Sequence, residues 1–353
     1  MATTITTVEE RLESGLLNLW YQVARSSEVT DRPVALRRLQ RDLVLWRGDQ
    51  GQLNVLEDFC PHRGAPLSLG QVVQGNVMCP YHGVQVTGAG IVAAVPPSPG
   101  CPMVGQKLVR NYPVREQAGA IFVYFAEDPN AEAPEPIFPE ELTSPQWDQF
   151  LYAAVWRCNW QVTMDNRTDP VHGSYLHTGT FTLDRGRKDT VLKVEPTAHG
   201  FQTYRDNQRG VNLDWHEVIF HPGNSFWIRT EVPYPPAFGG GSFFIVGHPT
   251  PIDRDATLVN LWRTRKVSGW QRDLWRFMYK NRLKQRNDEV VEQDRVLLEA
   301  IPPAARTRER LFQTDTAVIR MRRMLRAEAM RQLGISASGP EQAAAMAALG
   351  QEG

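Results

Sequence analysis

The stretch that decides the fold reads CPHRGAPLSLGQVVQGNVMCPYHG and runs from residue 60 to residue 83. It holds two of the chain's four cysteines, and a histidine follows each of them closely. Glycines and prolines flank both Cys/His pairs, which predicts two tight turns that hold the pairs rigidly. Thiolates and imidazoles are metal ligands, so we expect a metal centre here. Its four candidate ligands are Cys60, His62, Cys79 and His82.

Two kinds of metal centre fit this set of ligands. One is tetrahedral zinc, in which all four ligands share one ion. The other is a [2Fe–2S] cluster with both cysteines on one iron and both histidines on the other. A zinc finger typically begins with two cysteines and ends with two histidines, whereas here each loop carries one of each. Mixed pairs suit two metals, so the spacing favours the cluster.

The composition is ordinary for a globular protein and shows no charge bias. The 353 residues are enough for two domains, and 39 basic side chains balance 39 acidic ones. This balance gives no case for nucleic acid or an anionic membrane as partner. The N-terminus lacks the pattern of a signal peptide, and no segment is apolar enough to span a bilayer. Four cysteines do not make a disulfide scaffold, so we expect a reducing cytoplasm.

The first part of the chain reads as strands and turns. The apolar runs at 42–47 and 53–58 are separated by the turn-rich GDQGQ, which predicts a hairpin. We therefore expect a small all-β domain over residues 18–128, preceded by an N-terminal segment at 1–17. The Pro- and Glu-rich stretch at 129–141 marks the boundary that follows it.

The second part of the chain, residues 129–335, is expected to form a separate domain. Strands alternate with turns over 190–266. Apolar residues recur at helical spacing over 269–300 and again over 311–333, which predicts long helices at the end of the domain. The last residues, 336–353, are expected to form a flexible tail.

A second group of metal-ligand types lies in NWQVTMDNRTDPVHGSYLHTGTF, residues 159–181. Asp165, Asp169 and His172 are spaced for one face of a helix. His177 falls off that face unless the nearby proline and glycine bend or loosen the helix. Two imidazoles and a carboxylate that converge make the facial triad of non-haem Fe(II) sites, which leaves positions open for O2 and substrate.

The motifs CPHRG, CPYHG and DPVHGSYLH resemble the signatures of the Rieske non-haem iron oxygenases, and the resemblance covers roughly residues 18–335. It implies a Rieske [2Fe–2S] cluster on the four ligands named above. It also implies a mononuclear Fe(II) on His172, His177 and a carboxylate from a C-terminal helix. In the segment EQDRVLLEAI that carboxylate is expected to be Asp294, with Asp288 as its rival.

The resemblance gives Asp169 a role outside the iron. In the family the matching aspartate bridges a cluster histidine and an iron-ligating histidine across a subunit boundary, which here implies His82 of one subunit and His172 of the next. The alternative from the residues alone is a helix cap before Pro170. One position departs from the family pattern, because Val84 stands where Trp commonly follows YHG. This departure bears on cluster packing or donor docking and not on ligation.

The resemblance implies an α+β fold. It consists of a small all-β Rieske domain and a helix-grip (START-like) catalytic domain with a curved antiparallel sheet and C-terminal helices. The chain looks most like the phthalate dioxygenase-like and vanillate O-demethylase-like subgroup. Such enzymes are homotrimers that receive electrons from NAD(P)H through a separate reductase, in some cases with a ferredoxin. They use O2 to hydroxylate, dihydroxylate or O- or N-demethylate a small organic substrate.

An aromatic acid or aryl ether is the expected substrate, by analogy with the subgroup. Two alternatives stay open, a natural-product tailoring hydroxylase and a Rieske electron-transfer protein fused to a ligand-binding domain. Arginines are candidates for pairing with a carboxylate or sulfonate, and a solvated surface position is the alternative for each: Arg205, Arg209 and Arg229. The other candidate substrate-binding residues are Asn166, His216, Phe226 and Phe243.

Overall fold

The computed structural model describes residues 5, 7–179, 191–205, 215–233 and 240–335. The chain forms two compact units, one of residues 17–136 and the other of residues 1–16 together with 137–353. The N-terminal segment therefore belongs to the second unit, where helix α1 (Val8–Ser14) contacts the helices at residues 160–168 and 316–332. The tail expected at 336–353 lies outside the described residues.

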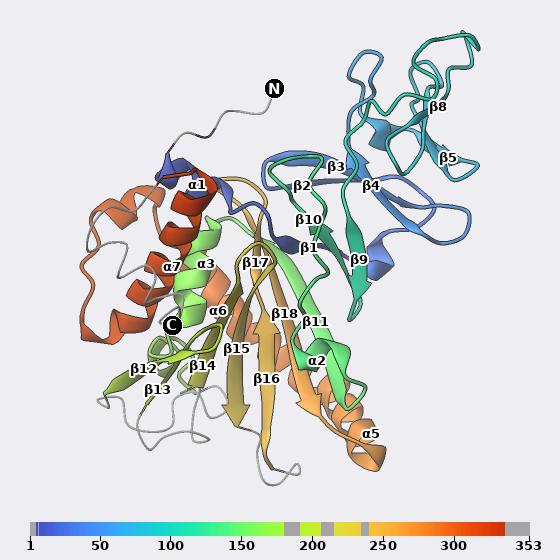
Figure 1. The fold of residues 1–353 in the computed structure, drawn as a ribbon. Helices are drawn as coiled ribbons and strands as arrows, with labels where there is room; N and C mark the ends of the chain where they lie inside the picture. The colour runs from blue at the N-terminus through green and yellow to red at the C-terminus, as the bar shows by residue number, and fades with distance from the viewer. Residues whose placement is uncertain (1–4, 6, 180–190, 206–214, 234–239, 336–353) are drawn as a thin grey trace. The chain divides into compact units, whose positions relative to one another are not determined.

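The unit of residues 17–136 is built from short antiparallel strands in three small sheets (Figure 1). The first sheet has the order β1 (Trp20–Arg25), β10 (Ala120–Tyr124), β9 (Val114–Gln117). The second has the order β2 (Val34–Arg38), β3 (Arg41–Arg47), β4 (Leu53–Glu57). The third has the order β5 (Gln71–Val73), β6 (Asn76–Met78), β7 (Gln85–Val86), β8 (Val92–Ala94). Single 3-10 turns occur at Ser26–Glu28 and Leu67–Leu69.

The predicted hairpin is present as the β3–β4 pair, which GDQGQ connects, with Leu45 opposite Val55. Its apolar residues form a core with the third sheet, because Val44, Trp46 and Leu56 pack against Val77. Both cysteines of the opening stretch belong to this core and are about 1% exposed. The two loops that carry the Cys/His pairs are therefore anchored in this packed apolar core.

The second unit contains an eight-stranded antiparallel sheet. Its order is β11 (Trp147–Trp156), β18 (Thr257–Lys266), β16 (Ser242–Gly247), β15 (Ser225–Pro233), β14 (Trp215–His221), β13 (Gly200–Arg205), β12 (Leu192–Thr197), and β17 (Pro249–Pro251) pairs with β18. The strand-rich prediction for this region is confirmed.

Helices cover this sheet, and they come from both ends of the unit (Figure 1). The longer helices are α3 (Trp160–Thr168), α5 (Gly269–Met278), α6 (Lys284–Ala300) and α7 (Thr316–Gln332). Short helical turns are α2 (Glu140–Thr143), α4 (Gly173–Leu176), and the 3-10 turns at Pro303–Thr307 and Gln313–Asp315. Helix α3 contacts both α6 and α7. No helix in the described ranges is long and apolar enough to cross a membrane.

Helices α5 and α6 run into each other through one turn of π-helix, η4 (Tyr279–Leu283). The predicted helical segment at 269–300 is therefore continuous but not uniformly α-helical. Tyr279 stacks on Phe150 of β11 with ring centroids 3.8 Å apart. Val291 and Leu298 fix α6 on β11 and β18, where they join the core around Trp156.

Candidate metal centres

The two Cys/His loops of the first unit share one backbone design. In the first loop, Gly64 N–H donates to the carbonyl of Cys60 at 2.8 Å, and Cys60 N–H donates to Ala65 at 2.9 Å. In the second, Gly83 N–H donates to Cys79 at 3.0 Å, and the Cys79 N–H donates to Val84 at 2.8 Å. Both glycines have positive φ, the left-handed conformation that disfavours other residues. Each loop is thereby closed tightly around its cysteine.

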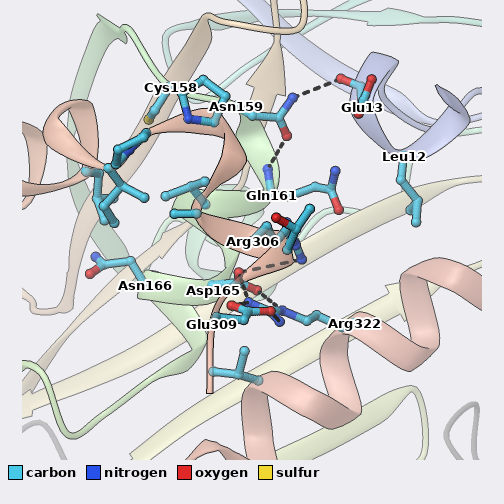
Figure 2. A pocket seen from close by; sticks show the side chains of 18 of the residues that line it. Leu12, Glu13, Cys158, Asn159, Gln161, Asp165, Asn166, Arg306, Glu309 and Arg322 are labelled. Atoms are coloured by element: carbon cyan, nitrogen blue, oxygen red, sulfur yellow. Dashed lines mark hydrogen bonds and ion pairs between the residues drawn. The ribbon is translucent and has the colours of Figure 1, made fainter. Parts of the chain in front are cut away.

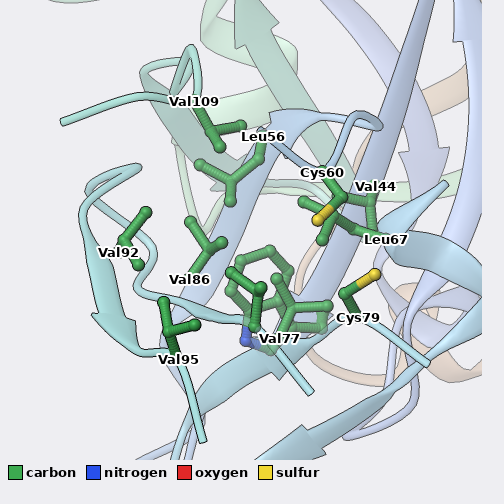
Figure 3. Close-up of a cluster of buried hydrophobic side chains, with 12 residues drawn as sticks. Val44, Leu56, Cys60, Leu67, Val77, Cys79, Val86, Val92, Val95 and Val109 are labelled. Atoms are coloured by element: carbon green, nitrogen blue, oxygen red, sulfur yellow. The ribbon is translucent and has the colours of Figure 1, made fainter. Parts of the chain in front are cut away.

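Packing brings the side chains of the two loops together. Cys60 and Cys79 lie at one edge of the apolar cluster, beside Val44 and Leu67 (Figure 3). Burial raises the pKa of the Cys60 thiol, and the adjacent Cys79 adds to this effect. Val84, the position that departs from the family pattern, is about 1% exposed in the same cluster. Its smaller side chain is thus part of the packing under the loops.

The donor set fits two metals better than one. The ring centroids of His62 and His82 are 4.5 Å apart, and the buried Nδ1 of His82 has no hydrogen-bond partner. A tetrahedral zinc would need its four ligand atoms within roughly 4 Å of one another. Across the described part of the chain, no three of these four residues bring ligand atoms within 4.8 Å of one another. Two cysteines side by side and two histidines side by side suit a [2Fe–2S] cluster.

In the second unit, His172, His177 and Asp294 bring ligand atoms within 4.8 Å of one another. Nε2 of His172 lies 3.5 Å from Asp294 Oδ1, and Nε2 of His177 lies 3.3 Å from the same atom. This oxygen is buried and has no hydrogen-bond partner. Two imidazole nitrogens around an orphaned carboxylate oxygen fit a divalent metal, and the ligand set is that of a facial Fe(II) site.

The histidines reach this geometry because the helix stops between the two motif halves. Helix α3 ends at Thr168, since a residue before proline disfavours the α conformation and Asp169 is extended. The short α4 follows and carries His172 and His177 at its two ends. Their rings are 5.3 Å apart between centroids. The prediction of one continuous helix face was therefore wrong, and the proline acts as a break instead of a bend.

Other groups hold the Nδ1 atoms of both histidines, so each Nε2 faces Asp294. Nδ1 of His172 lies 2.6 Å from the backbone carbonyl of Asp169. Nδ1 of His177 lies 2.8 Å from Oε1 of Gln293. A carbonyl acceptor fixes the proton on Nδ1 and leaves the Nε2 lone pair for a metal. Gln293 was not found from the sequence, because an amide far along the chain carries no ligand signal.

Electrostatics in the three-residue group favour a charged carboxylate. Burial alone would raise the pKa of Asp294, but the adjacent imidazoles of His172 and His177 outweigh it and hold that pKa well below its usual range. Burial alone would lower the pKa of His172, but Asp294 and Asp169 outweigh it and raise that pKa. Without a metal, a positively charged imidazole therefore neutralises the Asp294 carboxylate. A bound metal cation would supply this positive charge instead.

The rival carboxylate, Asp288, has other partners. It accepts from Arg263 Nη1 at 2.8 Å and from Lys284 Nζ at 2.6 Å. Asp294 shares a face of α6 with the buried Val291 and Leu298, at spacings of three and four residues. Asp288 also lies three residues from Val291, so helix periodicity does not separate the two aspartates in the sequence, and the difference comes from their partners in the fold.

Asp169 uses its side chain to cap the turn that follows. Its Oδ1 accepts from Val171 N–H at 2.7 Å and its Oδ2 from His172 N–H at 3.3 Å. The carboxylate also lies 3.8 Å from Nδ1 of His172. These bonds close a turn over residues 169–172 and fix the direction of the carboxylate, but Asp169 is the C-cap of α3 and the N-cap of α4 is His172, so the predicted helix N-cap at Asp169 was wrong.

A cavity of about 1060 Å³ opens on this unit, lined by residues of α1, α3, α6 and α7. Asn166, Asp169 and His172 are among its lining residues. Figure 2 shows the ion pairs on the wall of this cavity, where Nη2 of Arg322 lies 2.6 Å from Oδ2 of Asp165. The predicted substrate residue Asn166 thus lies at the cavity, close in sequence to the metal group.

The other candidate substrate residues lie on the sheet. Strand register puts His216, Phe226 and Phe243 on one face of the sheet. His216 is opposite Thr230, and Phe243 is opposite Val232. Thr230 and Val232 lie an even number of residues from Phe226 on β15, so all these side chains point to the same side. Phe243 packs against Trp275 in a separate core cluster. Among the candidate arginines, Arg229 pairs with Glu141 and Glu217, Arg205 is about 1% exposed, and Arg209 lies outside the described residues.

Comparison with protein families supports both halves of this description. Residues 19–113 match the Rieske [2Fe-2S] domain, and residues 156–331 match the vanillate O-demethylase oxygenase C-terminal domain. The chain is 33% identical over 162 residues to the vanillate O-demethylase oxygenase subunit of Pseudomonas sp. (strain HR199 / DSM 7063), covering 45% of this chain and 44% of the relative. It is 32% identical over 182 residues to the oxygenase component of dicamba O-demethylase from Stenotrophomonas maltophilia, covering 50% and 52%. The matches thus span about half the length of these curated relatives.

Solved structures share the fold along most of the chain. Dicamba monooxygenase bound to 3,6-dichlorosalicylic acid superposes with a TM-score of 0.71 at 22% identity, covering 93% of this chain and 99% of the other. NdmA of Pseudomonas putida CBB5 superposes with a TM-score of 0.72 at 21% identity, covering 97% of both. The predicted α+β architecture is confirmed. The chain therefore belongs to the Rieske non-haem iron oxygenases, with a Rieske domain followed by a catalytic domain of the vanillate O-demethylase oxygenase type.

Proposed function

We propose that this chain is the terminal oxygenase of a multi-component system, which hydroxylates, dihydroxylates or O- or N-demethylates a small organic substrate with O2. The observation that carries the proposal is the convergence of His172, His177 and Asp294 around an orphaned carboxylate oxygen. This group occurs in the same chain as a Rieske domain. A one-electron carrier needs no such second site, whereas oxygen chemistry at a facial site needs a source of electrons.

The metals would occupy the two groups of ligands described above. The loop cysteines would hold one iron of a [2Fe–2S] cluster and the loop histidines the other, and the three-residue group would hold Fe(II). When bound, the cluster supplies one-electron transfer and the Fe(II) supplies activation of O2. The protein residues position these groups. The Asp169 carbonyl and Gln293 orient the two imidazoles, and the cavity next to His172 gives access.

We propose that Asp169 links His172 to His82 of the partner subunit in a homotrimer. Support comes from the family resemblance and from the position of the carboxylate. Asp169 keeps about a quarter of its side chain exposed and lines the open cavity, while two backbone N–H groups hold it in place. A carboxylate held in this way can accept a further hydrogen bond from an imidazole that docks from outside.

The electron donor and the substrate are proposed from the relatives. A separate reductase that oxidises NAD(P)H, alone or with a ferredoxin, would reduce the cluster, and a cytoplasmic location stays a prediction. An aromatic acid or aryl ether is the proposed substrate class, because two relatives are named for O-demethylation of vanillate and of dicamba. A natural-product substrate remains the alternative.

Iron content tests the proposal directly. We expect about three irons per chain in the wild type, two from the cluster and one from the facial site. Asp294→Ala should lower this to about two without changing the cluster absorption, whereas Asp288→Asn should keep three. Two irons in the wild type would instead identify an electron carrier fused to a binding domain, and absence of iron–sulfur absorption would indicate zinc. NADH-driven turnover with a surrogate reductase, followed by product mass, then shows how many oxygen atoms are added.

A further inference from the structure

Arg167 lies on α3, is half-buried, and has no carboxylate partner among the described residues. Its Nη2 donates to the carbonyl of Ile228 at 3.3 Å, and its buried Nε has no hydrogen-bond partner. Burial lowers the pKa of Arg167 to about 10, with Asp294 acting against that shift. Within the described ranges, Arg167 makes no ion pair. A buried N–H donor without an acceptor is unfavourable, so the Nε of Arg167 is a donor that the fold leaves unused.

Three other arginines of the same unit do pair with carboxylates. The pairs are Arg229 with Glu141, Arg263 with Asp288, and Arg322 with Asp165. In the other unit, the buried Arg38 meets no carboxylate but makes three hydrogen bonds to backbone carbonyls. Arg167 makes one such bond, and the negative charge that acts on it belongs to Asp294, which the proposed Fe(II) would use. Arg167 is therefore left with unused donors beside the metal group.

Two more enclosed polar atoms lie on the sheet nearby. His216 of β14 is opposite Thr203 of β13, so both side chains lie on one face of the sheet. The Nδ1 of His216 and the Oγ1 of Thr203 are buried without hydrogen-bond partners, and these residues are 4% and 0% exposed. Burial, followed by the charge of Arg167, holds the pKa of His216 well below its ordinary value, so this imidazole is neutral and one of its nitrogens carries a proton.

We propose that Arg167, with His216 and Thr203, binds a carboxylate group of the substrate on the sheet face beside the three-residue metal group. A carboxylate accepts two parallel N–H bonds from a guanidinium, and its remaining lone pairs accept from an imidazole N–H and a hydroxyl. It also supplies the negative charge that the fold does not place next to Arg167. The proposal rests on the oxygenase function above, and it narrows the substrate class to organic acids.

Direct binding to the iron-loaded holoenzyme tests this site without turnover. The probes are matched acid and amide pairs, namely benzoate and benzamide, 4-methoxybenzoate and 4-methoxybenzamide, and phenylacetate and phenylacetamide, titrated by calorimetry. We expect at least one acid to bind about 10- to 100-fold more tightly than its amide. Arg167→Gln should abolish that ratio, and Arg167→Lys should keep part of it. The matched control is Arg308→Gln, which changes an exposed arginine and should leave the ratio intact.

Each outcome separates this proposal from the oxygenase function. Equal binding of acid and amide in every pair, or an acid preference that survives Arg167→Gln, overturns the carboxylate site. A purely structural role for Arg167 would lower the unfolding midpoint of Arg167→Gln without changing the acid-to-amide ratio, and this also overturns it. If neutral compounds are oxygenated while acids are not, the oxygenase stands and the carboxylate site falls. If acids bind through Arg167 but no oxygen is incorporated, the site stands and the oxygenase falls.

Discussion

Gln293 offers a sharp test of how the metal group is built, because it touches only the far side of one ligand. Its Oε1 lies 2.8 Å from Nδ1 of His177, whose side chain is about 2% exposed. Gln293→Leu keeps the approximate size and removes the acceptor. Water cannot replace the lost bond at so enclosed a nitrogen, so the Nδ1 proton is left unsatisfied and the tautomer with Nε2 protonated becomes competitive.

The expected loss follows from these contacts. An unsatisfied buried donor costs about 1–3 kcal/mol, and loss of such an orienting partner typically weakens a metal site about 10- to 100-fold. We therefore expect the Fe(II) dissociation constant of Gln293→Leu to rise by that factor. Gln293→Glu should stay within a few-fold of the wild type, since a carboxylate still accepts from Nδ1. Gln285→Leu changes an exposed glutamine on the same helix and is the matched control.

Anaerobic competition between the protein and a coloured Fe(II) chelator measures this constant, with the cluster absorption as an internal reference for folded protein. If Gln293→Leu binds Fe(II) as tightly as Gln285→Leu, the hydrogen bond does not orient the ligand and the reasoning fails. If the cluster absorption falls together with the Fe(II) affinity, the substitution acts on folding as a whole, which also contradicts the local account.

Three further predictions concern the same unit. Asp169→Asn should keep both metal contents, because the amide oxygen can still accept from Val171 N–H, but should lower coupled turnover about 10- to 100-fold; wild-type turnover would contradict the bridging role. Arg229→Met leaves the Glu141 carboxylate, about 1% exposed, without its partner and should destabilise by about 3 kcal/mol in urea unfolding, whereas adding Glu141→Leu should recover most of this loss. Burial lowers the pKa of His248 to about 3, so the unfolded chain takes up the proton first as pH falls below about 6.5, and stability drops. Between about pH 7.0 and 5.5 the wild type should therefore lose about 1 kcal/mol more than His248→Gln, and equal losses would contradict this account.

The sequence predicts those parts of the molecule that local chemistry determines. The hairpin at residues 41–57 follows from two apolar runs around a turn, and the cluster loops follow from cysteine, histidine and glycine at short spacing. The convergence of His172 with His177 was also foreseeable, because the motif carries a proline and a glycine. Its cause was misjudged, since the extended conformation before Pro170 ends α3 outright.

The features that the sequence did not yield depend on contacts between distant segments. Gln293 reaches His177 across 116 positions of the chain. Arg229 looked like a free cation in the sequence, but Glu141, 88 positions away, meets it in the fold. Arg167 carried no signal in the sequence, and only the structure shows that its Nε is buried without an acceptor. Charge pairing of this kind has no periodicity, so pattern analysis cannot detect it.

The π-helical turn at Tyr279–Leu283 determines the direction in which the side chains of α6 point. A π turn holds one more residue than the α-helix around it, and such single-residue insertions are frequent at functional sites. Deleting one residue there would allow α5 and α6 to merge into a uniform α-helix, in which each later side chain turns by about 100° and shifts by about 1.5 Å. Asp294 and Gln293 would then point away from both histidines. Deletion of one residue upstream of Asp294 would therefore abolish Fe(II) binding without altering any residue that binds the metal.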